Sequence, residues 1–318
     1  MDLTERQQYE LLAAISARGE IPMKFVYLGA GAHRWDAIYR HDEHGAGVTS
    51  EEGQLMMTHI KSLLRAFEHA EGVNLVDLGC GNGLPALEIL KHLRQEGFSV
   101  NYVPVDFSQE MLKLASKNIT QALSDISITE LSLDFESESL ASQLLNVKQK
   151  TKFPNLLINL GNTLGNYVNV EGTLTNFLQS MALDDYLIIG NGLINDRNPQ
   201  KILRGYTDVE PIKQAVTAPA RELGLFDDSD DYQVLWNSVQ RRIEIRIELN
   251  QDRTLSLAGQ STTIEKGDQI LVAQSRKYTE TSLTKILSRV GFRTELLTTN
   301  RHRSYILAMV QPTRYSAS

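Results

Sequence analysis

The sequence predicts an α/β protein in which a mostly parallel, Rossmann-like sheet, covered by helices on both faces, is interrupted by an antiparallel insert. Three observations lead to this fold class. Short apolar runs alternate with amphipathic helical segments from about residue 73 to residue 190. The character of the sequence changes after about residue 198, and at residues 243–249 single apolar residues alternate with charged ones, which is typical of half-exposed antiparallel strands. A helix and two further strands then close the chain.

Composition and charge limit the classes of protein to consider. The chain has 318 residues, 42% of them hydrophobic, and a net charge of −7, which suits a globular protein of one or two domains. No block of like charge is present, so a nucleic acid is a poor candidate for a partner. The N-terminus lacks a signal-peptide core, and the apolar runs are too short to cross a membrane. The single cysteine, Cys80, cannot form an internal disulfide. We therefore expect a soluble, cytoplasmic protein; a monomer is compatible with the sequence, which does not set the oligomeric state.

The first half of the chain supplies helices and strands in alternation. Helical spacing occurs over residues 5–18 and 50–70, and the second segment carries one stripe formed by Leu55, Met56, His59, Ile60, Leu63 and Leu64. Strands are expected at residues 73–78, 100–105, 126–133, 155–160 and 185–190. Helices are expected between them at residues 85–96, 109–121 and 173–183. Ser108 is the predicted N-cap of the helix that starts at residue 109.

The second half begins with the insert. The stretch IEIRIEL, residues 243–249, reads as a half-exposed strand, and more strands are expected at residues 255–258, 262–265 and 270–278. A helix at residues 281–290 and strands at residues 293–298 and 304–310 follow. We predict one domain from residues 56–198 and 279–318. A second domain is predicted from residues 1–55 and 199–278, since the N-terminal residues should pack with the insert.

The sequence DLGCGNG, from Asp77 to Gly83, lies where the first strand of the sheet meets a helix. Gly79, Gly81 and Gly83 allow a sharp turn and the close approach of a ligand to the backbone. Amides at the start of a helix favour a negative group such as a carboxylate. The spacing GxGxG after Asp77 suits S-adenosylmethionine (SAM) better than NAD, whose enzymes more often show GxGxxG. We count Cys80, inside this motif, among the cofactor-binding candidates.

Acids at two further strand ends extend the predicted cofactor site. Asp106 ends the second strand, where a carboxylate can accept hydrogen bonds from both ribose hydroxyls. Asp134 and Phe135 end the third strand, where they could take an adenine amino group and flank its ring. Any one of these features could be only a tight turn or an exposed acid, but together they occur in the expected order. The closing helix and two strands are typical of methyltransferases. We therefore predict a class I methyltransferase fold with SAM as cofactor and no metal.

Longer motifs, spread from about residue 20 to residue 310, resemble those of one family. The most specific is NLGNTLGNY at residues 159–167, which is similar to the family's G-[SG]-T-[IL]-G-N-[FL]. Further matches are YVPVD (102–106), GYTD (205–208), RELGLFDD (221–228), RRIEIRIEL (241–249) and KGDQILVAQSRKY (266–278). The chain thus resembles the histidine-specific SAM-dependent methyltransferases, which make trimethylhistidine on the way to ergothioneine. It is also similar to their fungal relatives that N-methylate prenylated tryptophan.

This resemblance implies roles for particular residues in an amino-acid substrate site. Asn166 matches the asparagine that meets the substrate's amino group and carboxylate, and Tyr206 matches a tyrosine that helps to hold the carboxylate. These two are the catalytic candidates, and they would orient the amine rather than act as strong bases. Ser275 matches the serine of E-x-S-x-K-Y, and Tyr27 matches a tyrosine that closes over the amino acid. For Tyr27 and Tyr206 the alternative is a simple packed aromatic ring.

Departures from the family pattern bear on the substrate. In members that methylate histidine, a glutamate two positions before the serine binds the imidazole, and here that position is Ala273. The methionine of R-I-E-M is Ile245. The second tyrosine of a Y-Y-x-T-x-x-E stretch is missing around residues 43–54, which hold glycines and His44, and Leu84 and Pro85 replace a basic residue after the glycine turn.

We therefore expect a SAM-dependent methyltransferase of an α-amino group whose small-molecule substrate is not histidine, with an aromatic or apolar side chain favoured. Three other functions stay open at this point. One is methyl transfer to oxygen or carbon of another small molecule. The second is a non-catalytic homologue that binds SAM, and the third is an NAD-dependent reductase.

Overall fold

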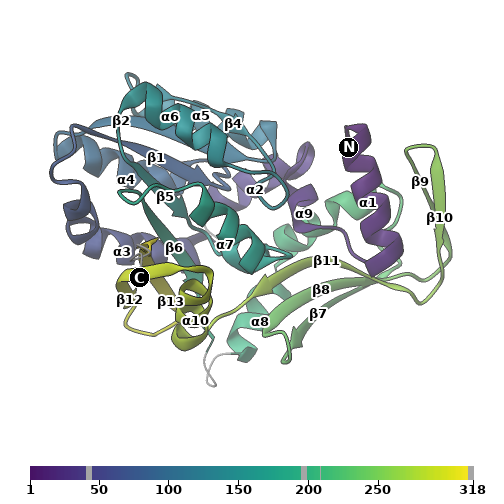
Figure 1. Cartoon of the computed structure of the whole chain (residues 1–318). Helices are drawn as coiled ribbons and strands as arrows, with labels where there is room; N and C mark the ends of the chain where they lie inside the picture. The colour runs from purple at the N-terminus through teal and green to yellow at the C-terminus, as the bar shows by residue number, and fades with distance from the viewer. Residues whose placement is uncertain (41–44, 195–198, 208, 314–318) are drawn as a thin grey trace, which may run out of the picture. The chain divides into compact units, whose positions relative to one another are not determined.

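A computed structural model describes residues 1–40, 45–194, 199–207 and 209–313 (Figure 1). The chain divides into two compact units, each formed by two segments of sequence. Met1–His44 and Asp196–Lys277 form the first, which we call the insert unit. Gly45–Asn195 and Tyr278–Ser318 form the second, which we call the sheet unit. None of the helices within the described ranges is long and apolar enough to cross a membrane.

The sheet unit is built on one eight-stranded sheet. Its strands are β1 (Gly72–Leu78), β2 (Ser99–Asp106), β3 (Ser127–Ile128), β4 (Leu131–Ser132), β5 (Asn155–Asn159), β6 (Tyr186–Gly192), β12 (Phe292–Thr299) and β13 (Tyr305–Pro312). The order across the sheet is β12-β13-β6-β5-β1-β2-β3, and β4 also pairs with β2. Strands β1 to β6 are parallel, whereas β13 runs antiparallel between β6 and β12. This mixed sheet confirms the predicted fold class.

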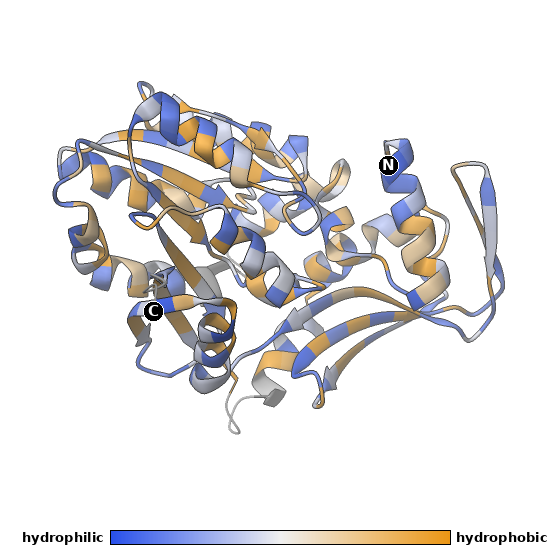
Figure 2. Ribbon diagram, viewed as in Figure 1, coloured by the Kyte–Doolittle hydropathy of each residue, from blue (hydrophilic) through white to orange (hydrophobic). Residues whose placement is uncertain are grey.

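Helices cover both faces of this sheet because its central strands are apolar on both sides. All seven residues of β1 are buried; Val73 and Leu75 join one core cluster, and Val76 and Leu78 join the other. In Figure 2 the central strands of this sheet carry many hydrophobic residues, drawn in orange. The first cluster is closed by α3 (Gly45–Leu64), α4 (Leu84–Gln95) and α5 (Gln109–Ala122). The second is closed by α6 (Ala141–Thr151), α7 (Val170–Gln179) and α10 (Glu280–Val290).

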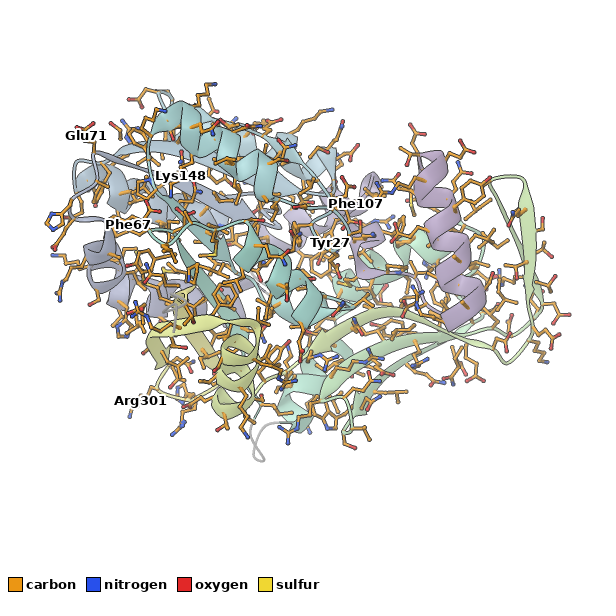
Figure 3. The ribbon with its side chains drawn as sticks, in the orientation of Figure 1. Tyr27, Phe67, Glu71, Phe107, Lys148 and Arg301 are labelled. Carbon is orange, nitrogen blue, oxygen red and sulfur yellow. The ribbon has the colours of Figure 1, made fainter. Side chains whose placement is uncertain are left out.

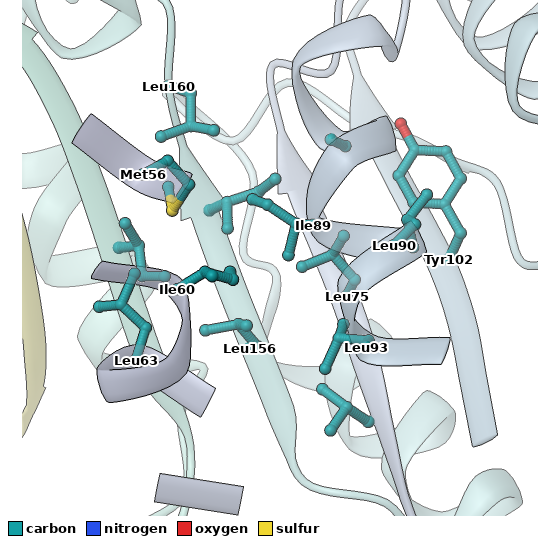
Figure 4. Packing of buried hydrophobic residues seen from close by; sticks show 14 of the residues in the cluster. Met56, Ile60, Leu63, Leu75, Ile89, Leu90, Leu93, Tyr102, Leu156 and Leu160 are labelled. Carbon is teal, nitrogen blue, oxygen red and sulfur yellow. The ribbon is translucent and has the colours of Figure 1, made fainter. Parts of the chain in front are cut away.

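Local sequence signals set where several of these helices lie. In Figure 4 the apolar stripe of α3, with Met56, Ile60 and Leu63, packs in the same cluster as Leu75 of β1 and Leu156 of β5. Ser108 is the N-cap of α5, as predicted, because its hydroxyl accepts a hydrogen bond from the Met111 amide at 3.3 Å. Two short 3₁₀ segments, η2 (Arg65–Phe67) and η3 (Thr163–Asn166), complete the sheet unit.

The insert unit combines helices with antiparallel strands. Its helical segments are α1 (Glu5–Arg18), η1 (Met23–Tyr27), α2 (Ala30–Arg40), α8 (Pro199–Thr207) and α9 (Glu210–Glu222). Its strands are β7 (Asp231–Asn237), β8 (Arg242–Glu248), β9 (Arg253–Leu257), β10 (Gln260–Ile264) and β11 (Gln269–Arg276). The order β11-β8-β7 makes one antiparallel sheet, and β9 and β10 form a separate hairpin. Residues near the N-terminus belong to this unit: the Ile21 amide donates to the Leu271 carbonyl, and the Leu271 amide donates to the Gly19 carbonyl, both at 2.8 Å.

The sequence-based expectation differs from the structure at a few elements. The prediction of a single strand over residues 126–133 was wrong, because the chain forms two strands of two residues each there, β3 and β4. Between them, the Thr129 amide donates to the Tyr102 carbonyl of β2 at 2.9 Å. The helices α2, α6, α8 and α9 and the strand β7 were not predicted. α8 and α9 have a clear amphipathic periodicity, so a helical signal was present in the sequence there and was missed.

Candidate functional site

The loops that follow β1 and β5 carry most of the candidate cofactor site. From β1 the chain crosses to β2 on one side, whereas β5 lies on the other side of β1, so the strand order reverses between β1 and β5. In open α/β sheets ligands bind outside the carboxyl ends of the strands at such a point. All the predicted cofactor-binding residues and Asn166 lie on loops or strand ends at this edge of the sheet unit.

The glycine turn after β1 contains glycines with different surroundings. Gly79, Gly81 and Gly83 all have left-handed backbones, with φ of +71°, +52° and +75°. A Cβ atom on Gly83 would lie 3.0 Å from the Cα of Ala115 and 3.1 Å from the hydroxyl of Tyr102. A Cβ atom on Gly81 would meet nothing within 4 Å. Gly83 is therefore required by packing, whereas Gly81 leaves the backbone open to a ligand.

Asp106, at the end of β2, lies against this turn. Its carboxylate accepts hydrogen bonds from the amides of Gly81 at 3.2 Å and Ser108 at 2.9 Å. Burial raises the pKa of Asp106 to about 6, against the lowering effect of these amides, so its carboxylate is ionised at neutral pH. The Cys80 thiol is 3.9 Å from the same carboxylate, and burial raises its pKa well above the usual range. Cys80 thus stays protonated, and it belongs to the core cluster that α3, α4 and α5 close.

Asp77 differs from Asp106 in that its carboxylate is hydrogen-bonded to a side chain of the neighbouring strand. The hydroxyl of Tyr102 on β2 donates to it at 2.8 Å, and only 4% of the residue is exposed. Burial raises the pKa of Asp77 to about 7, and the nearby carboxyls of Asp106 and Glu52 add to the rise. Asp77 therefore joins β1 to β2 directly below the glycine turn.

Asp134 and Phe135 follow β4. The Asp134 carboxylate accepts from the Glu136 amide at 3.2 Å and from the Ser137 hydroxyl at 2.7 Å, so it closes a local turn. The ring of Phe135 packs edge-on against Tyr167, with a centroid separation of 5.7 Å. Its outermost carbon would lie 3.7 Å from a Cβ atom on Gly79. The structure thus brings Phe135 beside the glycine turn.

The segment NLGNTLGNY, after β5, is held from both ends. The Asn159 side chain donates to the Leu78 carbonyl at 3.0 Å and to the Tyr167 hydroxyl at 2.6 Å. Asn162 adopts a left-handed backbone with φ of +65°, and its side-chain oxygen accepts a hydrogen bond from the amide of Gly192. Asn166 is half-buried at the end of η3. These bonds fix the loop that carries Asn166 to the ends of β1 and β6.

In the insert unit, Ala273 and Ser275 lie in two rows of cross-strand neighbours. Ala273 pairs with Ile245 of β8, which pairs in turn with Val234 of β7. Ser275 pairs with Ile243, which pairs with Trp236. Residues that are directly paired share one face of a sheet. We call these six residues the apolar rows (Val234, Trp236, Ile243, Ile245, Ala273 and Ser275), because Ser275 alone contributes a hydroxyl.

The opposite face of the same strands is charged. Glu244 is paired with Arg242 and Arg246 at 2.7 Å and 2.8 Å, and Arg242 also donates to Gln274. These arginines lower the pKa of Glu244 even though burial raises it. The two faces of the three-stranded sheet therefore have separate chemistry, and the charged groups are paired among themselves.

Lys277 links Tyr206, on α8, to Ser275, because its ammonium group contacts both hydroxyls. The ammonium of Lys277 lies 3.0 Å from the Ser275 hydroxyl and 3.4 Å from the Tyr206 hydroxyl. Burial raises the pKa of Tyr206, but the Lys277 charge and hydrogen bonds from Ser275 and Lys277 outweigh it and lower the pKa. Tyr27, which is labelled in Figure 3, ends η1. Its ring packs against Trp35, with ring centroids 5.6 Å apart. His44 and Asp208, the acid of GYTD, lie outside the described residues.

Comparison with known proteins assigns the chain to a family. The model of a family described as "Histidine-specific methyltransferase, SAM-dependent" matches residues 7–312. The chain belongs to this family.

Two curated proteins and one solved structure are similar to the chain over most of its length. The chain is 24% identical over 289 residues to a histidine N-alpha-methyltransferase of Mycolicibacterium smegmatis, a match that covers 87% of this chain and 86% of the relative. It is 23% identical over 323 residues to N-methyltransferase imqF of Aspergillus flavus, with 93% and 82% covered. A SAM-dependent methyltransferase structure from Clostridium acetobutylicum is 12% identical, with 89% and 99% covered and a TM-score of 0.49. From the family match and the two curated relatives, the protein is a SAM-dependent N-methyltransferase of the histidine-specific family, and the NAD-dependent reductase considered above is set aside.

The glycine turn of this histidine-specific family member fits its cofactor. SAM supplies a methyl group on a positively charged sulfur. The open backbone at Gly81 leaves room for a ligand, and the ionised Asp106 lies beside it. A carboxylate at the end of the second strand can accept hydrogen bonds from ribose hydroxyls, so both features suit a nucleoside. Within the described ranges, no group of three or more His, Cys, Asp or Glu side chains is placed to hold a metal ion.

Glu52 is a residue of this site region that the sequence analysis missed. It lies on α3 and is 3% exposed; both its oxygens accept from the Gly161 amide at 3.1 Å, and one accepts from the Tyr305 hydroxyl. Burial raises its pKa to about 7. Its signal in the sequence is the spacing of Thr49 and Glu52, which matches the T-x-x-E end of the stretch whose second tyrosine is missing.

Replacing Glu52 with glutamine should flatten the dependence of stability on pH. Because the folded pKa of Glu52, about 7, lies above its ordinary value of 4.5, the folded state binds more protons in this window. Stability is therefore lost as pH rises from about 4.5 to about 7, and Asp77 and Asp106 act in the same direction. Between pH 5.5 and pH 7.5, Glu52→Gln should lose about 2 kcal/mol less unfolding free energy than the wild type.

Urea unfolding at several pH values measures this difference. The control is Glu88→Gln, because Glu88 is an exposed residue of α4. An unchanged pH slope in Glu52→Gln would contradict the expectation.

Proposed function

We propose that this enzyme methylates the α-amino group of an amino acid other than histidine, with an aromatic or apolar side chain. The observation that carries the proposal is the set of apolar rows around Ala273 and Ile245. Histidine-methylating members carry a glutamate at the position of Ala273. The relative named as a histidine N-alpha-methyltransferase supports the α-amino group as the methyl acceptor.

The chemistry of the apolar rows favours a side chain with fewer polar ring atoms than an imidazole has. An imidazole placed against Ala273 and Ile245 would lose its hydrogen bonds to water and find no acceptor there, at a cost of about 1–3 kcal/mol. An indole, phenyl or alkyl group gives up less, and it gains about 25 cal/mol for each Å² of apolar surface that is buried. A site built to bind a ring N–H discriminates strongly, so losing the acceptor changes which substrate is preferred.

The chain's own residues have simple tasks in this reaction. The transfer is an in-line displacement in which the nitrogen lone pair must point at the methyl carbon, so orientation provides most of the acceleration. We assign Asn166 to the substrate's amino group and carboxylate and Tyr206 to the carboxylate. Asp106 and the glycine turn hold the cofactor, beside Phe135. Ser275 and the apolar rows receive the rest of the substrate, with Tyr27 over the amino acid.

A methylation assay tests the proposal. Purified enzyme with SAM is offered histidine, tryptophan, tyrosine, phenylalanine, leucine and the amines formed from them by decarboxylation, and products are identified by mass spectrometry. We expect added methyl groups on an aromatic or apolar amino acid and little product from histidine. Rapid trimethylation of histidine would contradict the proposal. Product on oxygen or carbon, or none at all, would replace it with another function.

Replacing Ala273 with glutamate should shift the preference toward histidine. The new carboxylate would accept a hydrogen bond from the imidazole, so kcat/KM for histidine should rise about 10-fold while that for the aromatic substrate falls. The matched control is Gln274→Glu, which places the same carboxylate on the neighbouring residue of β11, on the charged face. Competition assays with both substrates measure the ratio. An equal shift in both variants would show that the added charge, not its position, is responsible.

A further inference from the structure

We propose that Lys277 provides the positive charge that binds the substrate's carboxylate, and that it thereby makes the enzyme select amino acids over the corresponding amines. The proposal rests on the proposed function and adds a specificity-determining residue to it. It starts from a buried cation whose hydrogen-bond partners, among the described residues of the insert unit, are polar but uncharged.

Lys277 is a buried lysine, with 5% of its surface exposed. Its ammonium contacts the hydroxyls of Ser275 and Tyr206, and it lies 5.7 Å from the centre of the Tyr206 ring. No carboxylate in the described ranges forms an ion pair with it. Other shielded cations of the chain differ in this respect. Lys148 pairs with both Asp184 and Asp185, and Arg253 pairs with both Asp227 and Asp230.

Removing an ammonium group from water costs free energy, and neutral partners such as hydroxyls offset that cost only in part. A bound anion would offset more of it, and a carboxylate suits the site best because it accepts several hydrogen bonds at once. The Ser275 and Tyr206 hydroxyls both accept from the ammonium. The cluster therefore places one charged donor between two hydroxyl groups, which suits a carboxylate.

The position of this cluster suits the two ends of an amino acid. Ser275 belongs to the cluster and also to the apolar rows, where Ala273 lies two residues earlier on the same face of β11. Residues two apart on a strand are about 6.6 Å apart along it. A carboxylate bound at Lys277 thus leaves the substrate's side chain within reach of Ala273 and Ile245.

Comparing an amino acid with its own amine isolates this contact. The pair is the preferred substrate of the wild-type enzyme and the amine formed from it by decarboxylation, for example tryptophan and tryptamine. The variants are Lys277→Met, which removes the charge and keeps the length, and Lys277→Gln, which keeps a polar group. Lys266→Met is the control, because Lys266 is an exposed lysine of the same unit. Thermal unfolding and SAM binding confirm that each variant is folded.

We expect the wild type to prefer the acid. Lys277→Met should lower kcat/KM for the acid about 30-fold, mainly through KM, and change that for the amine less than about 3-fold. Lys277→Gln should behave in the same way, so that it replaces Lys277→Met if that variant does not fold. Lys266→Met should match the wild type for both substrates.

Several results would overturn the inference. Equal losses for acid and amine would show a structural role, and no loss would show no role. If Lys277→Met has no further effect in a Tyr206→Phe background, Lys277 acts only through Tyr206. A wild-type enzyme that methylates acid and amine equally well overturns this inference alone. A wild-type enzyme that methylates none of these compounds overturns the proposed function, and this inference with it.

Discussion

Alanine at Gly83 should unfold the glycine turn, whereas alanine at Gly81 should leave the fold intact and weaken SAM binding. Both glycines have left-handed backbones, which costs an alanine about 1 kcal/mol. At Gly83 the new methyl group would also press on the α5 backbone at Ala115 and on the buried Tyr102 hydroxyl. Overpacking of this kind adds about 1–3 kcal/mol, so the loss of unfolding free energy should be about 3 kcal/mol.

At Gly81 the same methyl group meets no protein atom, so it costs only the backbone conformation. It would occupy the space through which a ligand approaches the backbone, and SAM affinity should fall about 10-fold. Urea unfolding and calorimetric titration with SAM, applied to both variants, measure the two effects. The expectation fails if Gly81→Ala is the less stable variant, or if it binds SAM as the wild type does.

The second large effect is expected from Asp106→Asn, which should weaken SAM binding about 100-fold. Two hydrogen bonds from ribose hydroxyls to a carboxylate are stronger than those to an amide, since bonds to charged groups contribute about 1.5–3 kcal/mol each. The Asn amide would also meet the amides of Gly81 and Ser108, which both donate to Asp106. Some loss of stability should accompany the loss of binding, so the melting temperature is measured in parallel.

The pH dependence of binding separates this effect from simple loss of structure. Because the pKa of Asp106 is about 6, wild-type affinity for SAM should fall as pH drops through 6 and the carboxylate becomes protonated. Asp106→Asn should lack this step. Asp184→Asn, which removes an exposed carboxylate of the same unit, serves as the control and should keep it. A step of the same size in Asp106→Asn would exclude Asp106 as its origin.

Much of the sheet unit could be predicted from the sequence because its signals are local. Strands buried on both faces are apolar along their whole length, as in β1, so they stand out against the helices between them. The glycines of the turn were found because left-handed backbone conformations require them. Asp106 was found because a residue that ends a parallel strand lies at the ligand-binding edge of the sheet. The family motifs and the SAM cofactor followed from the same order of residues.

The short strands β3 and β4 show where local pattern stops being sufficient. Residues 126–133 have the composition of one strand, yet only four residues in this stretch pair with β2. Whether a residue pairs depends on its register with the partner strand, and the composition of one strand gives no information about that register. The same applies to β7, whose place at the edge of the three-stranded sheet is decided by its pairing with β8.

The α/β class, the succession of strands and helices along the chain, the family and the cofactor could all be read from short stretches of residues that are close together in the chain. Which polar residues become buried depends on contacts between distant stretches. Glu52 meets Gly161 and Tyr305, and Lys277 meets Tyr206, across many intervening residues. A glutamate on a helix and a lysine after a strand look like ordinary surface residues in a sequence. Their pKa values and their chemistry change only when distant segments exclude water from them.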